Sequence, residues 1–216
     1  MTIRAKLYTA LVVAIAGLVL TVGVGIWGTS RLGDRFDRVQ RAADAQALAL
    51  QLKYDVTDFN GWQTAYGYDN GRSRTTFLRS VARFRADLAT AKRVLTRPAE
   101  EQVLDDVSAS FDDFMSVDRD AFAALESGRQ EEVRRLFLGP EITNFSRAAA
   151  AAQTLASYER TRAATEEEAF EDARRDALRL LVIVSVIAAL LVAILLVTAN
   201  DLARAAERAL GESASR

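Results

Sequence analysis

The chain has 216 residues and a formal net charge of −1, and it contains neither cysteine nor histidine. These absences exclude disulfides, zinc sites built on cysteine or histidine, and nucleophiles that depend on a histidine base. The composition, rich in alanine, leucine and arginine with only two prolines, is typical of long helices. The balanced charge gives no reason to expect nucleic acid as a partner. No bound cofactor is expected.

The first predicted element is a transmembrane helix over residues 7–27, an uncharged run long enough to cross about 30 Å of hydrocarbon. Arg4 and Lys6 precede it without an acidic residue, which favours a cytoplasmic location for residues 1–6. A cleaved signal peptide is the alternative, although its apolar region would be unusually long and no clear cleavage site follows.

Residues 28–177 are predicted to form an extracytoplasmic domain of four helices. The breaks between them are the stretches YDNGRS, TRPAEE and LESGRQ, with a smaller interruption at LGPEI. Gly71 and Gly128 suit the left-handed residue that follows a helix, and Ser73 is expected to cap the second helix. Pro98 fits a first helical position.

In the smaller interruption, Gly139 is expected to end a short helix and Pro140 to begin the long last helix.

Between the breaks, apolar residues recur at alternating steps of three and four, a spacing typical of left-handed helix packing. We call each such row of residues along one helix a seam. The predicted seams are Phe77, Val81, Phe84, Leu88, Ala91 and Leu95; Leu104, Val107, Phe111, Phe114, Ala121 and Leu125, joined by Asp118; and Ile142, Phe145, Ala149, Ala152, Ala156, Ala163, Phe170, Ala173 and Ala177, interrupted by Glu159 and Glu166.

These seams predict an all-α fold, an up-down-up-down four-helix bundle between two transmembrane helices. The second transmembrane helix is predicted over residues 178–199, followed by a short cytoplasmic tail at 200–216. Both termini then face the cytoplasm and the protein is a multi-pass protein of the cell (inner) membrane. The first and last helices are longer than the other two, so two chains are expected to pair near the membrane as a homodimer.

The stretch from Asp55 to Gly71 is unusually rich in aromatic, acidic and amide side chains. One interpretation is that Phe59, Trp62 and Tyr66 pack the core. A second is a polar pocket, inside the bundle or between two chains, for a small cationic or amphipathic ligand, since aromatic faces beside carboxylates suit cations. A third is a surface for a partner protein. The candidate ligand-binding residues are Asp55, Asp58, Trp62, Tyr66 and Asp69.

Other charged residues are interpreted more simply. Asp106, Asp113 and Asp120 recur every seven residues, and an acidic run covers 166–168; both are expected on solvated helix faces, without a metal. Arg147, Arg160 and Arg162 either meet an anionic ligand or pair with neighbouring acids, and both alternatives stay open.

The layout resembles the four-helix-bundle sensory module of methyl-accepting chemotaxis receptors, of actinobacterial type, over roughly residues 1–200. The stretches DFNGWQTAYGYD (58–69) and ALESGRQEEVRRLFLGPE (124–141) carry this resemblance. Family members continue into a HAMP linker and a methylated signalling hairpin, whereas NDLARAAERALGESASR follows the second span here. The chain is therefore expected to be a stand-alone or truncated module, and direct coupling to a chemotaxis kinase is in doubt.

The resemblance implies a sensor that detects an extracytoplasmic signal and passes a helix displacement across the membrane. Output would come from a partner, for example in mixed dimers with longer chemoreceptors. The alternative is a structural or assembly scaffold that binds no ligand. An enzyme is not expected, because no nucleophile motif accompanies the carboxylates.

Overall fold

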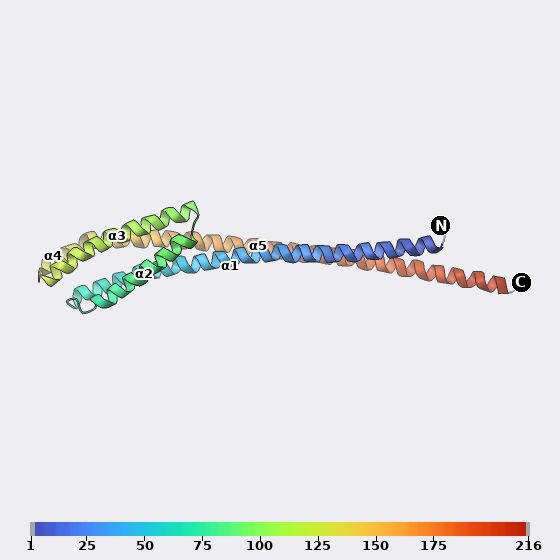
Figure 1. Cartoon of the computed structure of the whole chain (residues 1–216), viewed down its shortest axis with the longest axis horizontal. Helices are drawn as coiled ribbons and strands as arrows, with labels where there is room; N and C mark the ends of the chain where they lie inside the picture. Colours follow the sequence, from blue (N-terminus) through green and yellow to red (C-terminus); the bar gives the residue numbers. More distant parts are fainter. Residues whose placement is uncertain (1–2, 215–216) are drawn as a thin grey trace. The chain divides into compact units, whose positions relative to one another are not determined.

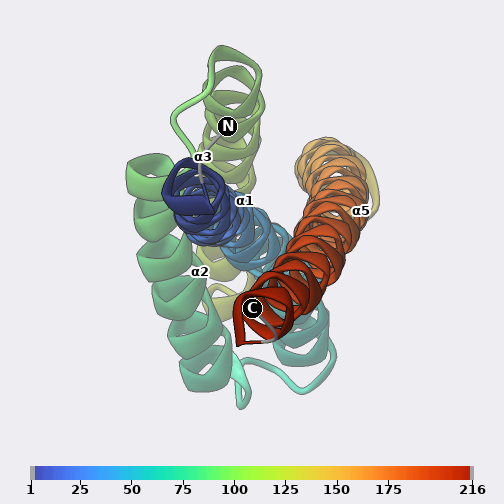
Figure 2. The same cartoon turned by 90° about the vertical axis from the view of Figure 1, so that its right-hand side faces the viewer.

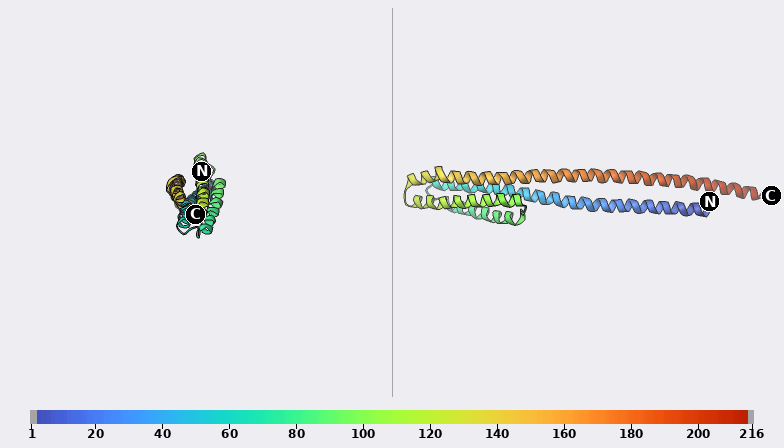
Figure 3. Two further views of the ribbon diagram at one scale, coloured as in Figure 1. Left: turned by 90° about the vertical axis from the view of Figure 1, so that its left-hand side faces the viewer. Right: turned by 90° about the horizontal axis from the view of Figure 1, so that it is seen from above.

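The computed structural model describes residues 3–214, which are almost entirely helical (Figure 1; Figure 2; Figure 3). Residues 1–2 and 215–216, the outermost parts of the predicted N-terminal segment and tail, lie outside this range. The described part contains no strand, so the predicted all-α class is confirmed. Its elements are α1 (Ile3–Tyr68), α2 (Arg74–Val94), α3 (Pro98–Glu126), α4 (Gln130–Leu136), the π-helical turn η1 (Phe137–Glu141) and α5 (Ile142–Ala214).

The chain divides into two compact units. The central unit is Arg38–Glu167, and the terminal unit combines Met1–Asp37 with Glu168–Arg216. The helices α1 and α5 each contribute to both units, whereas α2, α3, α4 and η1 belong to the central unit alone. The predicted extracytoplasmic domain, 28–177, therefore extends into the terminal unit at both ends.

The helices α1 and α5 are each long and apolar enough to cross a membrane. Their most apolar stretches lie in the terminal unit and are almost unburied, with 0% of the first and 6% of the second inside the structure. Large apolar side chains such as Leu18 and Leu196 are 67% exposed. Exposed apolar side chains of this kind agree with a membrane protein.

The turns agree with most of the sequence prediction. Gly71 and Gly128 have φ of +87° and +71°, the left-handed conformation expected after a helix. Pro98 is the first residue of α3, and the Glu100 carboxylate accepts a hydrogen bond from the Arg97 N–H at 3.0 Å. Ser73 precedes α2, but its side chain makes no cap; its hydroxyl donates to Asp69 at 2.5 Å instead.

The prediction for Gly139 and Pro140 was wrong, because no helix ends there. Residues Phe137–Glu141 form a π-helical turn that leads directly into α5. Proline has no N–H with which to continue the α-helical hydrogen bonds, so a wider turn accommodates it within a continuous helical path. The turn also carries Glu141, a buried carboxyl side chain, into the core.

The seam of α5 also differs from the prediction. Ile142 is 52% exposed, whereas the buried residues on this side are Glu141, Asn144, Ala148, Ala152, Leu155, Ala156 and Glu159. Over its first turns the buried face is therefore shifted by one residue. In α2 and α3, every residue of the predicted seams is buried, Asp118 included.

The core of the central unit is aromatic. The Phe59 ring lies 5.2 Å from the ring of Phe84, 5.5 Å from that of Phe111 and 5.0 Å from that of Phe114, measured between centroids. These rings come from α1, α2 and α3, and each is almost fully buried. Edge-to-face and tilted contacts of this kind stabilise a core beyond the area that they bury.

Two glycines near the end of α1 give a matched prediction. A Cβ at Gly61 would meet nothing within 4 Å, so Gly61→Ala should raise the free energy of unfolding by up to about 1 kcal/mol. A Cβ at Gly67 would overlap the ring of Phe137, so Gly67→Ala should lower it by about 1–3 kcal/mol. Thermal unfolding of the full-length protein in detergent measures both, and shifts of the same sign would contradict this packing.

Candidate functional site

The five residues predicted to bind a ligand lie in different surroundings. Asp55 and Tyr66 are fully buried, Asp58 and Asp69 are partly buried, and Trp62 is 39% exposed. Phe59 and Tyr66 do pack the core, as one interpretation expected, but Trp62 does not. The core face of α1 instead passes through Val56, Phe59, Gln63 and Tyr66.

Tyr66 belongs to a buried polar cluster that four elements build together. We call it the Tyr66 cluster; its members are Gln63 and Tyr66 of α1, Arg74 of α2, Asp118 of α3 and Glu141 of η1. Asp118 is fully buried, and its Oδ1 accepts hydrogen bonds from the Tyr66 hydroxyl and from Arg74 Nη1, the latter at 2.7 Å. Burial and the charge of Asp118 raise the pKa of Tyr66, so Tyr66 stays a neutral donor.

Arg74 is held by aromatic rings as well as by its ion pair. Its guanidinium lies 4.7 Å from the ring centroid of Tyr66 and 4.3 Å from that of Phe122. Cation–π contacts of this kind stabilise a partly desolvated cation. The side chain is 16% exposed, so Arg74 connects the cluster to the surface of the central unit.

Glu141 forms the other half of the cluster. Gln63 Nε2 donates a hydrogen bond to its Oε1, and among the described residues its Oε2 has no partner. Burial, followed by the charge of Asp118, raises the pKa of Glu141 to about 9, despite the opposing effects of Gln63 and Arg74. Glu141 is therefore an uncharged acid at neutral pH, and Asp118 Oδ2 likewise has no hydrogen-bond partner among the described residues.

A second cluster surrounds Arg83 of α2. Its guanidinium bonds Asp55 Oδ1 at 3.1 Å and Asp58 Oδ2 at 2.6 Å, so the structure brings these two predicted residues together. Burial, followed by a hydrogen bond with Asp87, raises the pKa of Asp55 to about 6. Asp69 lies apart from this cluster and accepts hydrogen bonds from the N–H and hydroxyl of Ser73.

A third cluster joins α3 to α5. Arg162 Nη1 bonds Glu100 Oε1 at 3.1 Å and Glu159 Oε2 at 2.7 Å, and both carboxylates are almost fully buried. Burial, followed by the hydrogen bond with Glu100, raises the pKa of Glu159 to about 7. Arg147 pairs with Asp113 at 3.0 Å, so for Arg147 and Arg162 the structure favours pairing with acids.

Residue spacing in the sequence does not identify Arg74, Arg83, Glu100 or Glu141 as parts of these clusters. Asp118 was the available signal, because a carboxylate in an apolar seam needs a partner. The partner lies 44 residues away in sequence, on another helix, and the spacing of residues along one helix cannot reveal it.

Comparisons with protein-family models, with curated proteins and with solved structures give no match to this chain. The geometry of the three polar clusters is therefore the basis for a functional proposal. The Tyr66 cluster is the strongest candidate site, because it joins four elements and leaves two buried carboxyl oxygens without a partner among the described residues.

The pKa of Glu141 leads to a pH-dependent prediction. Its pKa is about 9 in the folded protein against an ordinary 4.5, so its contribution to stability is complete below about pH 4.5 and is lost as the pH rises toward 9. Glu141→Gln keeps a neutral amide that can donate and accept. Between about pH 5 and pH 9, the melting temperature of this variant should fall less than that of the unsubstituted protein.

The control is Glu131→Gln, because the side chain of Glu131 is 85% exposed. Asp55 and Glu159, whose pKa values are also raised, are present in all three proteins. The difference in pH dependence of the melting temperature between Glu141→Gln and the unsubstituted protein therefore reports on Glu141 alone. Parallel curves for Glu141→Gln and the unsubstituted protein would show that Glu141 is ionised in the folded state.

Proposed function

We propose that this chain is a membrane-embedded sensory module similar to the extracytoplasmic part of chemotaxis receptors. In this proposal, residues 7–27 and 178–199 cross the cell membrane, and the central unit is an up-down-up-down four-helix bundle outside it. A change in the packing of the bundle displaces α5, and the displacement passes through the second span to a partner.

The observation that carries the proposal is the continuity of α5. One helix, Ile142–Ala214, begins beside the Tyr66 cluster, contributes Glu159 to the ion pairs with Arg162 and includes the second apolar run without a break. The π-helical turn before it carries Glu141. Such π-helical turns are frequent at functional sites.

The buried polar clusters support a sensor over a rigid scaffold. Asp118 and Glu141 each have a buried carboxyl oxygen without a hydrogen-bond partner among the described residues. Such oxygens destabilise one packing and reduce its advantage over another. A small difference between two packings is the condition under which a ligand can shift the population from one to the other.

Disulfide formation between two introduced cysteines tests the proposal directly. A Cβ at Gly28 would lie 4.0 Å from the Cβ of Ala177, within the range of a disulfide, and the chain has no cysteine of its own. In the Gly28→Cys/Ala177→Cys protein in nanodiscs, adding Glu141→Gln should change the rate of disulfide formation. The added substitution Glu131→Gln is the matched control and should leave the rate unchanged.

The second candidate is the scaffold without a ligand, and one observation favours it. The structure brings Asp55 and Asp58 together at Arg83, but it places Trp62, Tyr66 and Asp69 in other surroundings, so the five residues do not line one site. For a scaffold, Glu141→Gln leaves the rate of disulfide formation unchanged. An unchanged rate would therefore contradict the sensor and favour this candidate. Pairing of two chains, or of this chain with a longer receptor, is compatible with both.

A further inference from the structure

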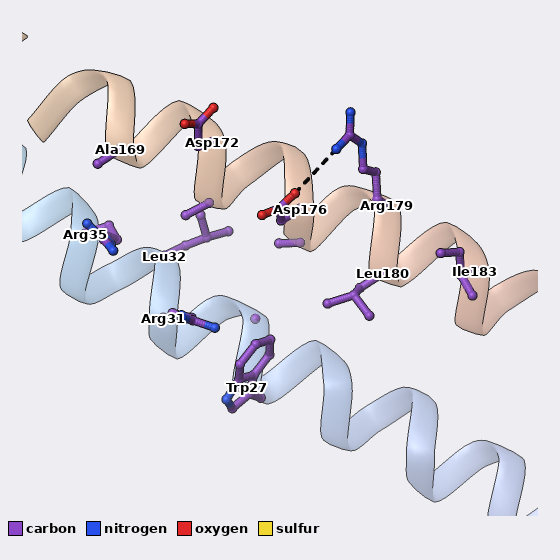
Figure 4. A pocket seen from close by; sticks show the side chains of 13 residues that line it. Trp27, Arg31, Leu32, Arg35, Ala169, Asp172, Asp176, Arg179, Leu180 and Ile183 are labelled. Atoms are coloured by element: carbon purple, nitrogen blue, oxygen red, sulfur yellow. Dashed lines mark ion pairs between the residues drawn. The ribbon is translucent and has the colours of Figure 1, made fainter. Parts of the chain in front are cut away.

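The terminal unit contains a cavity of about 500 Å³ between the first turns after the apolar run of α1 and the last turns before the apolar run of α5 (Figure 4). Trp27, at the end of the first apolar run, lines it. Leu180 and Ile183, at the beginning of the second run, line it as well. The cavity therefore lies where both candidate spans change from apolar to charged sequence.

The charges of this cavity favour an anion. Arg31, Arg35 and Arg179 line it together with Asp172 and Asp176. Both acids already have a cation on their own helix, because Asp172 pairs with Arg175 and Asp176 with Arg179. Within residues 3–214, Arg31 and Arg35 have no ion pair with a carboxylate.

Trp27 contacts Arg31 at the end of the first apolar run. The Arg31 guanidinium lies 4.9 Å from the ring centroid of Trp27, and Figure 4 shows the two side chains next to each other on α1. Tryptophan favours the membrane–water interface, and arginine there binds phosphate through paired N–H groups. Arg31 and Arg35 are one helical turn apart, so one phosphate can reach both.

A second, apolar cavity lies between the same two helices. Its volume is about 260 Å³, and apolar residues between Val13 and Leu20 of α1 and between Val184 and Leu191 of α5 line it. Along α5 it begins at Val184, directly after Ile183 of the charged cavity. The space between the helices thus changes from cationic to apolar in the direction of the hydrocarbon, as a phospholipid does from headgroup to acyl chain.

We propose that the terminal unit binds one anionic phospholipid. Arg31 and Arg35 hold its phosphate, and an acyl chain occupies the cavity beside Gly17 and Ala188. The apolar cavity next to the charged one favours a lipid over a free anion, because a lipid has an acyl chain to fill it and inorganic phosphate does not. The proposal is independent of whether the central unit senses a ligand.

Retention of lipid by the full-length protein tests this site. The protein is reconstituted in nanodiscs of equal parts phosphatidylglycerol and phosphatidylcholine, released into detergent and analysed by native mass spectrometry. We expect one phosphatidylglycerol per chain, retained in preference to phosphatidylcholine. Arg31→Gln/Arg35→Gln should reduce that preference by about fivefold for each arginine removed. Arg38→Gln/Arg41→Gln removes the same charge further along α1 and should preserve it.

Three results would overturn the proposal. Equal loss of lipid in the two double variants would mean that only net charge matters. Displacement of phosphatidylglycerol by inorganic phosphate would assign the arginines to a free anion. Efficient cross-linking between two chains through Leu20→Cys would place a second copy in the apolar cavity, in the position of the acyl chain.

Discussion

Replacing Phe59 with alanine should lower the free energy of unfolding by about 3–5 kcal/mol. The Phe59 ring is fully buried and contacts rings from both α2 and α3. Its removal leaves a cavity that these neighbours can fill only partly, so the loss includes both the burial of the ring and the cost of the cavity.

Trp62→Ala is the matched control, since it removes a larger aromatic side chain three residues further along the same helix. Trp62 is 39% exposed, so its loss should cost less than about 1 kcal/mol. Chemical denaturation of the full-length protein in detergent, followed by circular dichroism, compares the two. Equal losses would mean that the core face of α1 is not the one that passes through Phe59.

Asp118→Ala should lower the free energy of unfolding by about 3 kcal/mol. Asp118 accepts hydrogen bonds from both Arg74 and Tyr66 inside the core. Without it, the Tyr66 hydroxyl is buried without this acceptor and Arg74 loses its counter-charge. Because Asp118 also raises the pKa of Glu141, the same substitution should lower that pKa.

Asp113→Ala provides the comparison for Asp118. It breaks the ion pair with Arg147, whose two side chains are 56% and 58% exposed, and should cost less than about 1 kcal/mol. Denaturation of the two variants under the same conditions gives both values. If Asp118→Ala costs no more than Asp113→Ala, the Tyr66 cluster contributes nothing to the packing of the central unit.

The seams of α2 and α3 could be predicted because large apolar side chains mark them. Phenylalanine, leucine and valine recur at steps of three and four, and the charged residues between them leave one buried face. In α5 the corresponding face is largely alanine, which is found on buried and exposed faces alike. The face there is set by Leu155 and by the buried polar side chains of Glu141, Asn144 and Glu159, which a search for apolar periodicity passes over.

The polar clusters could be predicted only in part. Asp118 was visible as a carboxylate within an apolar seam, and Tyr66 as an aromatic side chain of the core. Their meeting depends on how three different helices are placed against one another, and residue spacing within one helix does not contain that information. Glu141 was hidden for another reason: the Gly139–Pro140 pair predicts a break, whereas the chain continues through a wider turn.

The central claim is that two spans hold the middle of this chain outside the membrane, and cysteine labelling tests it most directly. The chain has no cysteine, so each single substitution introduces one labelling site. The two sites are Ser127→Cys, in the turn between α3 and α4, and Asp201→Cys, after the second apolar run. Both residues are exposed. With a maleimide that cannot cross the bilayer, we expect labelling of Ser127→Cys in intact cells and of Asp201→Cys only after permeabilisation. Labelling of Ser127→Cys only after permeabilisation would contradict the account.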